Sequence, residues 1–282
     1  MLVTLFRLLS RLPLPILHAV GSALGWLVYL VSPKYRRRMA ANIRRAGFGD
    51  SLPQAVREAG KNVLELPFVW CAPPQRVLDS VRVEDWDVVQ QALDAGGGII
   101  FLTPHLGCFE ITAQVVATRT PLTVMYRPPR KEALKPLIEG ARARGRLRLA
   151  PATLSGVRTL LKTLRSGEPI GILPDQVPQN GEGVWADFFG LPAYTMTLPG
   201  KLQQMSGAPV ILTYAERLPR GAGFVLRFFR LDRALGDTAE QQARTINAAM
   251  EELIARCPAQ YFWSYHRYKA PKGVARPAAA RA

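Results

Sequence analysis

A regular alternation of short apolar runs with longer amphipathic segments is the feature that most constrains the fold of this chain. The apolar runs are rich in β-branched residues and predict strands over residues 98–103, 122–126, 169–173, 209–214 and 224–229. The segments around them predict helices over residues 50–69, 109–118, 132–143, 153–166, 196–206 and 238–256. Strands that alternate with helices tend to lie parallel, because a parallel neighbour needs a long crossover connection. We therefore expect an α/β fold with a central, mostly parallel mixed sheet flanked by helices, whose last strands are antiparallel across a turn at 218–223.

The amino terminus is apolar and is followed directly by a basic segment. Residues 12–31 read LPLPILHAVGSALGWLVYLV and contain no Asp, Glu, Lys or Arg. A helix needs about 20 apolar residues to cross a bilayer, so this segment is near the threshold. Residues 32–47 (SPKYRRRMAANIRRAG) have the charge expected on the cytoplasmic side of a membrane segment. We expect a membrane-attaching helix that either spans the bilayer or lies in its interface; a buried soluble helix and a signal peptide are the competing interpretations.

Charge and residue counts narrow the function classes. The 282 residues include 37 Lys and Arg against 21 Asp and Glu, a formal net charge of +16. Such a surface attracts nucleic acid, an anionic membrane or an acidic protein. The chain contains no recognised nucleic-acid-binding module, so we expect no nucleic-acid partner. Its three cysteines and three histidines lack metal-ligand spacing, which predicts no protein-bound metal, and no G-x-S-x-G elbow of an esterase is present.

The chemistry is expected after the first core strand, which runs into Thr103-Pro104-His105. In open α/β sheets, sites form at the carboxyl ends of the strands. Glu110 falls in the opening turn of the next helix, where a loop could bring it to His105. A carboxylate on one imidazole nitrogen leaves the other nitrogen to take a hydroxyl proton. The alternative is a structural histidine beside a helix amino terminus; Cys108 offers a covalent route, but we expect it to be packed in the core.

Two further strand ends carry polar residues. Arg127 follows the second core strand, and Asp175 and Gln176 follow the third. Parallel strands would bring these residues to the same rim as His105. We expect Asp175 to shape a turn or to pair with an arginine such as Arg127; a second catalytic acid is the alternative.

Six segments, taken in order, resemble the bacterial lipid A late acyltransferase family, within the lysophospholipid acyltransferase superfamily. They are YRRRMAANIRRA, HLGCFE, MYRP, GILPDQ, FFGLPAYT and YFWSYHRYK. The resemblance covers nearly the whole chain. It implies the α/β fold of the superfamily and an enzyme that moves a fatty acyl chain from acyl carrier protein to a hydroxyl of a lipid A precursor. That reaction uses no cofactor beyond the donor, and it takes place at the cytoplasmic face of the inner membrane with an anionic glycolipid acceptor.

The resemblance also assigns roles to residues. The catalytic histidine and acid of the family fall on His105 and Glu110, and its substrate-binding arginine and Asp-Gln pair fall on Arg127, Asp175 and Gln176. Arg127 would bind an acceptor phosphate or stabilise the developing oxyanion.

One departure from the family leaves the acceptor open. Cys108 and Phe109 stand where the family commonly has Asn and Trp. The alternatives are an acyltransferase for another glycolipid, a lysophospholipid or a lipoamino acid, and, more distantly, a catalytically dead membrane scaffold. The expected organisation is a membrane segment over residues 1–32, an α/β acyltransferase domain over 33–270 and a basic tail over 271–282.

Overall fold

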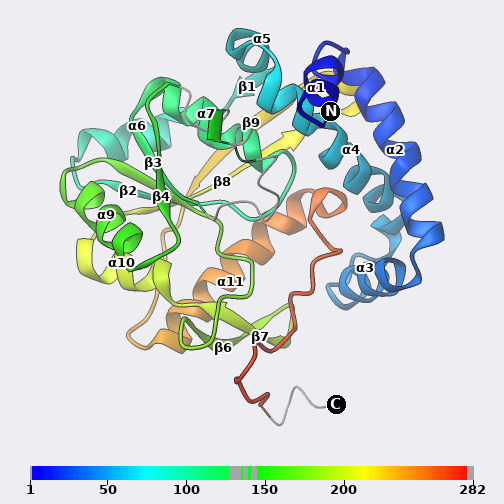
Figure 1. Ribbon diagram of the computed structural model, residues 1–282. Helices are drawn as coiled ribbons and strands as arrows, with labels where there is room; N and C mark the ends of the chain where they lie inside the picture. Colours follow the sequence, from blue (N-terminus) through cyan, green and yellow to red (C-terminus); the bar gives the residue numbers. More distant parts are fainter. Residues whose placement is uncertain (1, 127–134, 136–138, 141–144, 278–282) are drawn as a thin grey trace.

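The computed structural model describes residues 2–126, 135, 139–140 and 145–277. Seven of the described strands form one sheet, in the order β1-β9-β8-β2-β5-β3-β4, and two more form a separate hairpin (Figure 1). The sheet strands are β1 (Val81–Val83), β2 (Ile99–Leu102), β3 (Leu122–Tyr126), β4 (Leu147–Pro151), β5 (Pro169–Ile172), β8 (Val210–Arg217) and β9 (Phe224–Arg230). The hairpin strands are β6 (Gly183–Phe188) and β7 (Leu191–Met196).

The directions of the strands confirm the predicted α/β architecture. Strands β8, β2, β5, β3 and β4 run parallel to one another, β9 is antiparallel to β8, and β1 is parallel to β9. The antiparallel step across residues 218–223 is therefore as predicted. The alternation of apolar runs did not predict β1, β4 or the β6–β7 hairpin. Strand β4 lies at the sheet edge with Arg148 and Pro151 exposed, so it lacks the apolar run of a buried strand.

Helices cover both faces of the sheet. Helices α9 (Leu154–Arg165), α10 (Leu198–Ser206) and α11 (Ala239–Arg256) contribute to one hydrophobic core, and α6 (Trp86–Asp94) and α7 (Phe109–Arg119) contribute to the other. Strand β2 shows why both faces are closed. Its side chains alternate, with Ile100 and Leu102 in the first core and Ile99 and Phe101 in the second, and all four are buried. Burial on both faces explains why the strand is a continuous apolar run.

Local sequence signals fix where the long helices begin. Thr238 accepts a hydrogen bond from the backbone of Gln241, whose side chain bonds back to the Thr238 backbone, which forms a capping box for α11. Thr153 caps α9 in a similar way through the Gly156 backbone. Both helices lie within one residue of their predicted limits, whereas the helix predicted over 132–143 falls mostly outside the described residues.

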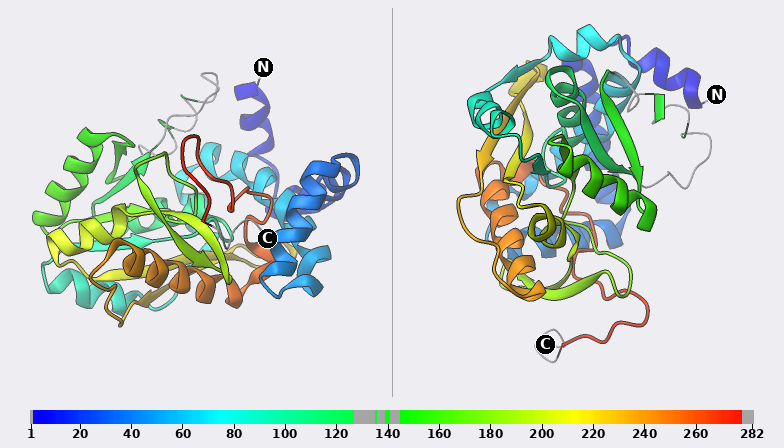
Figure 2. Two further views of the ribbon diagram at one scale, coloured as in Figure 1. Left: turned by 90° about the horizontal axis from the view of Figure 1, so that it is seen from below. Right: turned by 90° about the vertical axis from the view of Figure 1, so that its left-hand side faces the viewer.

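The amino-terminal helices gather at one end of the sheet (Figures 1 and 2). They are α1 (Leu2–Leu9), α2 (Leu14–Val31), α3 (Pro33–Arg45) and α4 (Leu52–Cys71), followed by the short α5 (Pro74–Leu78). Three short 3₁₀ turns, η1 (Gly49–Ser51), η3 (Pro219–Gly221) and η4 (Pro258–Gln260), complete the described helical structure. Helix α2 packs closely against α4 at glycines: a Cβ atom added to Gly60 would lie 1.9 Å from the Gly21 carbonyl oxygen. The backbones can approach this closely only because neither residue has a side chain.

Candidate active site

His105 and Asp175 face each other because their strands are paired in register. Leu102 of β2 is opposite Ile172 of β5, and His105 and Asp175 each follow three residues later. The imidazole Nδ1 lies 2.7 Å from one oxygen of the Asp175 carboxylate, and the His105 backbone N–H donates to the other oxygen at 2.9 Å. Both carboxylate oxygens therefore bond to the same residue, which fixes the position of the ring.

Gln176 contacts the opposite nitrogen of the ring. Its amide nitrogen lies 3.0 Å from Nε2 of His105. A carboxylate only accepts hydrogen bonds, so Nδ1 carries the proton that bonds to Asp175. Nε2 then presents a lone pair, to which the Gln176 amide donates. This is the tautomer in which a histidine can take a proton from a hydroxyl group.

The Asp175 carboxylate is buried but charged. Its side chain is 2% exposed, and that of His105 is 14% exposed. Burial by itself raises the pKa of Asp175, but attraction to His105 and the hydrogen bonds from its ring and backbone outweigh this effect, so the pKa lies below the ordinary value. Asp175 is therefore negative at neutral pH and can stabilise a positive charge on His105.

Aromatic rings line the site beside His105. The ring of Phe109 lies 4.7 Å from the imidazole, and that of Phe262 lies 6.3 Å away and nearly parallel to it. The Phe262 backbone N–H also donates to the His105 carbonyl at 3.0 Å. These apolar side chains beside the imidazole suit an acyl chain better than a polar substrate.

The loop that carries His105 is fastened to the sheet at Gly107. The Cys108 N–H donates to the Ala215 carbonyl at 2.8 Å, and the Gly107 N–H donates to the Gln260 carbonyl at 3.1 Å. Gly107 has a φ of +60°, and a Cβ atom there would lie 2.0 Å from the Ala215 oxygen. Only glycine fits this position, because any side chain would separate the loop from β8.

The structure places Glu110 at the start of α7, as predicted, where it accepts a hydrogen bond from the Trp70 indole at 3.1 Å. The carboxylate bonded to Nδ1 of His105 is that of Asp175, a partner that the sequence analysis does not assign to it. The catalytic role of Glu110 stays a prediction. Arg127, the predicted substrate-binding arginine, lies outside the described residues.

Cys108 is buried in the second core rather than presented to the site. Its side chain is 2% exposed. Burial, together with the negative charge of Glu65, raises the pKa of the Cys108 thiol well above its ordinary value. A thiol attacks as the thiolate, so this environment favours the packing role and opposes an acyl-cysteine mechanism.

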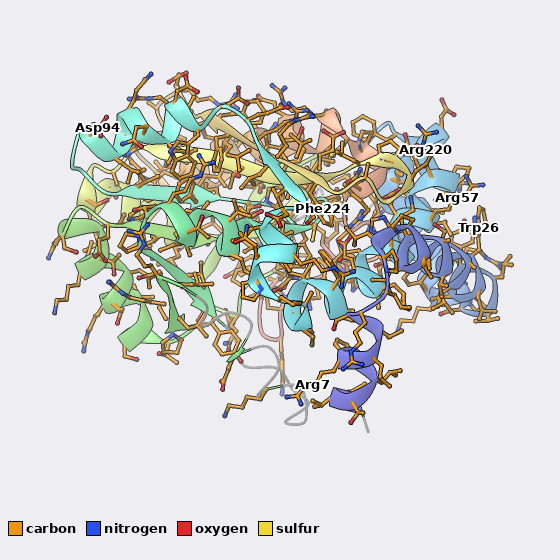
Figure 3. All side chains as sticks on the ribbon, turned by 90° about the horizontal axis from the view of Figure 1, so that it is seen from above. Arg7, Trp26, Arg57, Asp94, Arg220 and Phe224 are labelled. Carbon is orange, nitrogen blue, oxygen red and sulfur yellow. The ribbon has the colours of Figure 1, made fainter. Side chains whose placement is uncertain are left out.

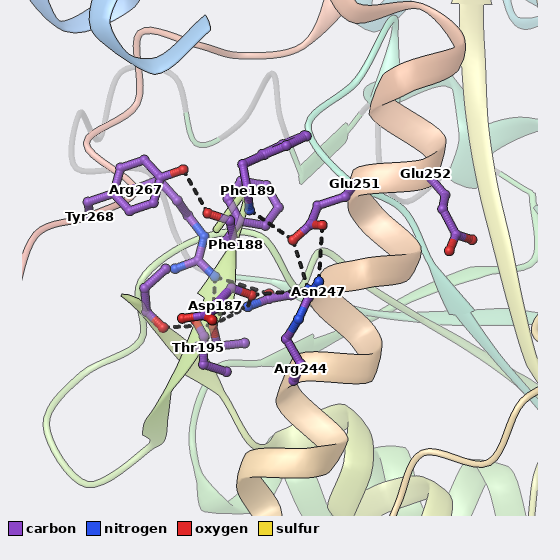
Figure 4. Close-up of polar contacts among 12 residues, drawn as sticks. Asp187, Phe188, Phe189, Thr195, Arg244, Asn247, Glu251, Glu252, Arg267 and Tyr268 are labelled. Carbon is purple, nitrogen blue, oxygen red and sulfur yellow. Dashed lines mark hydrogen bonds and ion pairs between the residues drawn. The ribbon is translucent and has the colours of Figure 1, made fainter. Parts of the chain in front are cut away.

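The carboxyl-terminal segment builds the layer behind Asp175. The buried Arg267 guanidinium donates to the Tyr194 carbonyl, the Thr195 hydroxyl and the Asn247 side chain, which join this segment to the hairpin and to α11 (Figure 4). Burial lowers the pKa of Arg267, an effect that nearby Tyr261 and Asp175 oppose. The segment YFWSYHRYK stands out in the sequence, but its contacts could not be predicted because they join residues far apart in the chain.

Comparison with known proteins places this chain in a family. The family model described as bacterial lipid A biosynthesis acyltransferase matches residues 1–270. The chain is 26% identical over 280 residues to a lipid A biosynthesis lauroyltransferase of Escherichia coli (strain K12), covering 95% of this chain and 90% of that protein. It is also 26% identical over 275 residues to a lipid A biosynthesis palmitoleoyltransferase of the same organism, covering 92% and 87%. The chain therefore belongs to the bacterial lipid A biosynthesis acyltransferase family and is an O-acyltransferase.

Proposed function

We propose that this enzyme transfers a fatty acyl chain from an acyl carrier protein thioester to a hydroxyl of a lipid A precursor, at the cytoplasmic face of the inner membrane. The observation that carries the proposal is the position of His105 between Asp175 and Gln176 at the carboxyl edge of the sheet. Asp175 bonds to Nδ1 of the ring. The partner of Nε2 is the Gln176 amide, which a substrate hydroxyl group can replace. Membership of the family supplies the class of reaction.

The acceptor hydroxyl takes the place of the Gln176 amide at Nε2. His105 removes its proton while the hydroxyl oxygen attacks the thioester carbonyl carbon, and Asp175 stabilises the imidazolium that forms. The tetrahedral intermediate collapses, the carbon–sulfur bond breaks, and the imidazolium proton passes to the departing thiolate. The products are an ester on the acceptor and a free thiol on the carrier, and His105 returns to its starting state.

The charge of the chain supports an acidic donor and an anionic acceptor. A net charge of +16 attracts both an acidic carrier protein and a phosphorylated glycolipid. Arg127 is proposed to bind a phosphate of the acceptor through its planar guanidinium, which matches phosphate with two parallel hydrogen bonds. Stabilisation of the oxyanion is the second role open to it.

Lipid analysis of cells that lack this protein tests the proposal. The cells would carry wild type, His105→Ala or no protein, with equal expression checked by immunoblot, and total lipids including lipid A would be compared by mass spectrometry. We expect one lipid A species to gain a single acyl chain with wild type only. A shift in another lipid class with lipid A unchanged would contradict the acceptor and make Phe109 the first suspect for its altered choice. If no lipid differs among the three kinds of cell, the alternative of a catalytically dead membrane scaffold is favoured.

A purified assay separates the donor from the acceptor. The same acyl chain would be offered as a thioester of acyl carrier protein or of coenzyme A. We expect faster transfer from the carrier protein, because its acidic surface complements the basic enzyme. Equal rates of transfer from the two thioesters, at both low and high salt, would contradict a protein donor.

A further inference from the structure

Helix α2 is long and apolar enough to cross a membrane by length and composition, and no other helix among the described residues meets that criterion. Its 18 residues would extend about 27 Å, close to the thickness of about 30 Å of a bilayer core. Length alone therefore does not decide between spanning the bilayer and lying on it. The packing of α2 against the rest of the enzyme distinguishes these two orientations.

One face of α2 is fastened to the enzyme along the helix. Gly21 and Gly25 meet the backbone of α4, and a Cβ atom on Gly25 would lie 2.2 Å from the Val56 carbonyl oxygen. His18, one turn before Gly21, lies 3.3 Å from Glu65 of α4. At the start of the helix, Arg76 donates to the carbonyls of Ser10 and Leu12 and holds the connection between α1 and α2.

The partner helix cannot enter hydrocarbon. Beside the glycine contact, α4 carries Glu58, Lys61 and Glu65, and the first and last of these bind the buried Arg217. Burial by itself raises the pKa of Glu65, but the positive charge of Arg217 lowers it by more. The pKa therefore lies below its ordinary value, and this carboxylate stays ionised. If α2 crossed the bilayer in this docked position, the charged middle of α4 would lie near the bilayer centre. Charged side chains there cost about 2.5–3.5 kcal/mol each on insertion scales.

The opposite face of α2 is an exposed apolar stripe. Its residues recur at helical spacing on one side: Ile16, Val20, Leu24, Leu27, Val28 and Val31. Helix α1 adds exposed Leu2, Leu5 and Leu8. We name these residues together the apolar stripe. Nothing polar interrupts it on α2, and so large an exposed apolar surface indicates a partner.

Basic residues at the end of the stripe identify that partner as an anionic lipid surface. Lys34, Arg36 and Arg37 are exposed on α3, immediately after Val31. Positive charge next to an apolar helix face is typical of helices that lie in the plane of an anionic membrane, buried by about 5–10 Å.

We propose that α1 and α2 lie in the interface of the anionic leaflet as a rigid part of the enzyme, with the apolar stripe inserted, rather than crossing the bilayer. The inference rests on the proposed function for the choice of membrane but not for the reaction. The inner side of α1 contacts the helix that follows His105 through one intermediate residue, because Phe6 stacks on Trp70 at 5.9 Å and the Trp70 indole bonds to Glu110.

Depth measurement along the stripe distinguishes the two orientations. Single cysteines would replace Ile16, Leu24 or Val31 in the full-length protein, in a background where the three native cysteines are alanine. Each would carry a fluorescent label in vesicles of phosphatidylethanolamine and phosphatidylglycerol, quenched by lipids brominated at known depths. We expect all three labels at one shallow depth. A label at position 24 near the bilayer centre, about 10–12 Å deeper than the labels at 16 and 31, would overturn the proposal in favour of a span.

Asp94→Cys provides the control, because this residue lies at the other end of the molecule from Trp26 of α2 (Figure 3). Its label should escape quenching at every depth. Flotation of Leu24→Glu with these vesicles tests the stripe independently: we expect at least tenfold weaker binding. Leu154→Glu, the same change at an exposed leucine of α9, should bind like wild type. Equal binding of the two variants would also overturn the proposal. Neither readout measures acyl transfer, so a failure of the proposed reaction would leave both results interpretable.

Discussion

At the scale of single residues, the candidate site depends on which carboxylate holds the imidazole. Asp175 is buried, ionised and bonded through both oxygens to His105. Glu110 is less buried than Asp175 and accepts a hydrogen bond from the Trp70 indole. The geometry gives Asp175 the role of fixing the tautomer of His105, while the catalytic role of Glu110 stays a prediction.

Replacing Asp175 by Asn should therefore lower kcat by about 10²- to 10⁴-fold, because an amide can donate to Nδ1 and hold the ring in the wrong tautomer. KM should change little, since both carboxylate oxygens of Asp175 are already bonded to His105. Steady-state kinetics on the purified enzyme would check both values, with far-UV circular dichroism as the control for folding. Glu110→Gln is the matched variant, with an expected loss smaller than that of Asp175→Asn. A larger loss for Glu110→Gln would reverse the two roles.

At the scale of elements, the joint between α2 and α4 decides how the amino terminus is attached. The two backbones touch at Gly21, Gly25 and Gly60, next to the buried Glu65–Arg217 pair. A joint of this kind is rigid, because neither helix can rotate or slide without bringing a side chain against backbone.

Gly60→Ala should open this joint. The added methyl group would lie 1.9 Å from the Gly21 oxygen, so α2 must move away from α4. We expect a loss of about 1–3 kcal/mol in the free energy of unfolding, as for other overpacked sites, and faster tryptic cleavage after Lys34 at the start of α3. Urea unfolding and limited trypsin digestion would measure these effects. Gly97→Ala is the control, because a Cβ atom there meets nothing within 4 Å. Equal stability of the two variants would show that α2 is not fastened at Gly60.

At the scale of the whole molecule, charge and apolar surface are arranged on the same end. The apolar stripe and the exposed basic residues of α3 belong to the amino-terminal helices, which lie together at one end of the sheet (Figure 2). Under the interfacial attachment proposed above, this arrangement would orient the enzyme on the membrane with part of its net charge of +16 facing the lipid headgroups.

Replacing Lys34, Arg36 and Arg37 by Gln should weaken binding to phosphatidylglycerol vesicles. Each basic residue near an anionic surface contributes about 1 kcal/mol, so the three together should lower the partition coefficient about 10²-fold. The difference from wild type should shrink at high salt, because screening removes the electrostatic part. Vesicle sedimentation at two salt concentrations would measure it.

The control removes the same charge from the opposite end of the sheet. Gln at Arg158, Lys162 and Arg165, all exposed on α9, lowers the net charge equally. This variant should keep most of its affinity for the vesicles. Equal losses in the two triple variants would mean that net charge, and not its place in the fold, governs binding.

The sequence by itself determined the α/β class, most of the central strands and the edge of the sheet on which the site lies. Those features depend on local periodicity and on the rule that residues following parallel strands meet at one edge. It also identified His105, Asp175 and Gln176 as residues of that edge, because each follows a buried apolar run directly. These signals are local, so they can be recognised without knowing which distant residues are in contact.

Only the tertiary structure decided the pairing of these residues. Five residues separate His105 from Glu110 in the chain and seventy separate it from Asp175, yet the Leu102–Ile172 register of β2 and β5 brings Asp175 to Nδ1. The register depends on the packing of both sheet faces, which no short segment encodes. The packing of α2 on α4 was likewise decided by the tertiary structure, and it supports the interfacial attachment proposed above. Its apolar run permits both a span and an interfacial helix, and the glycine contact with α4 favours the second, because charged residues of α4 cannot follow α2 into hydrocarbon.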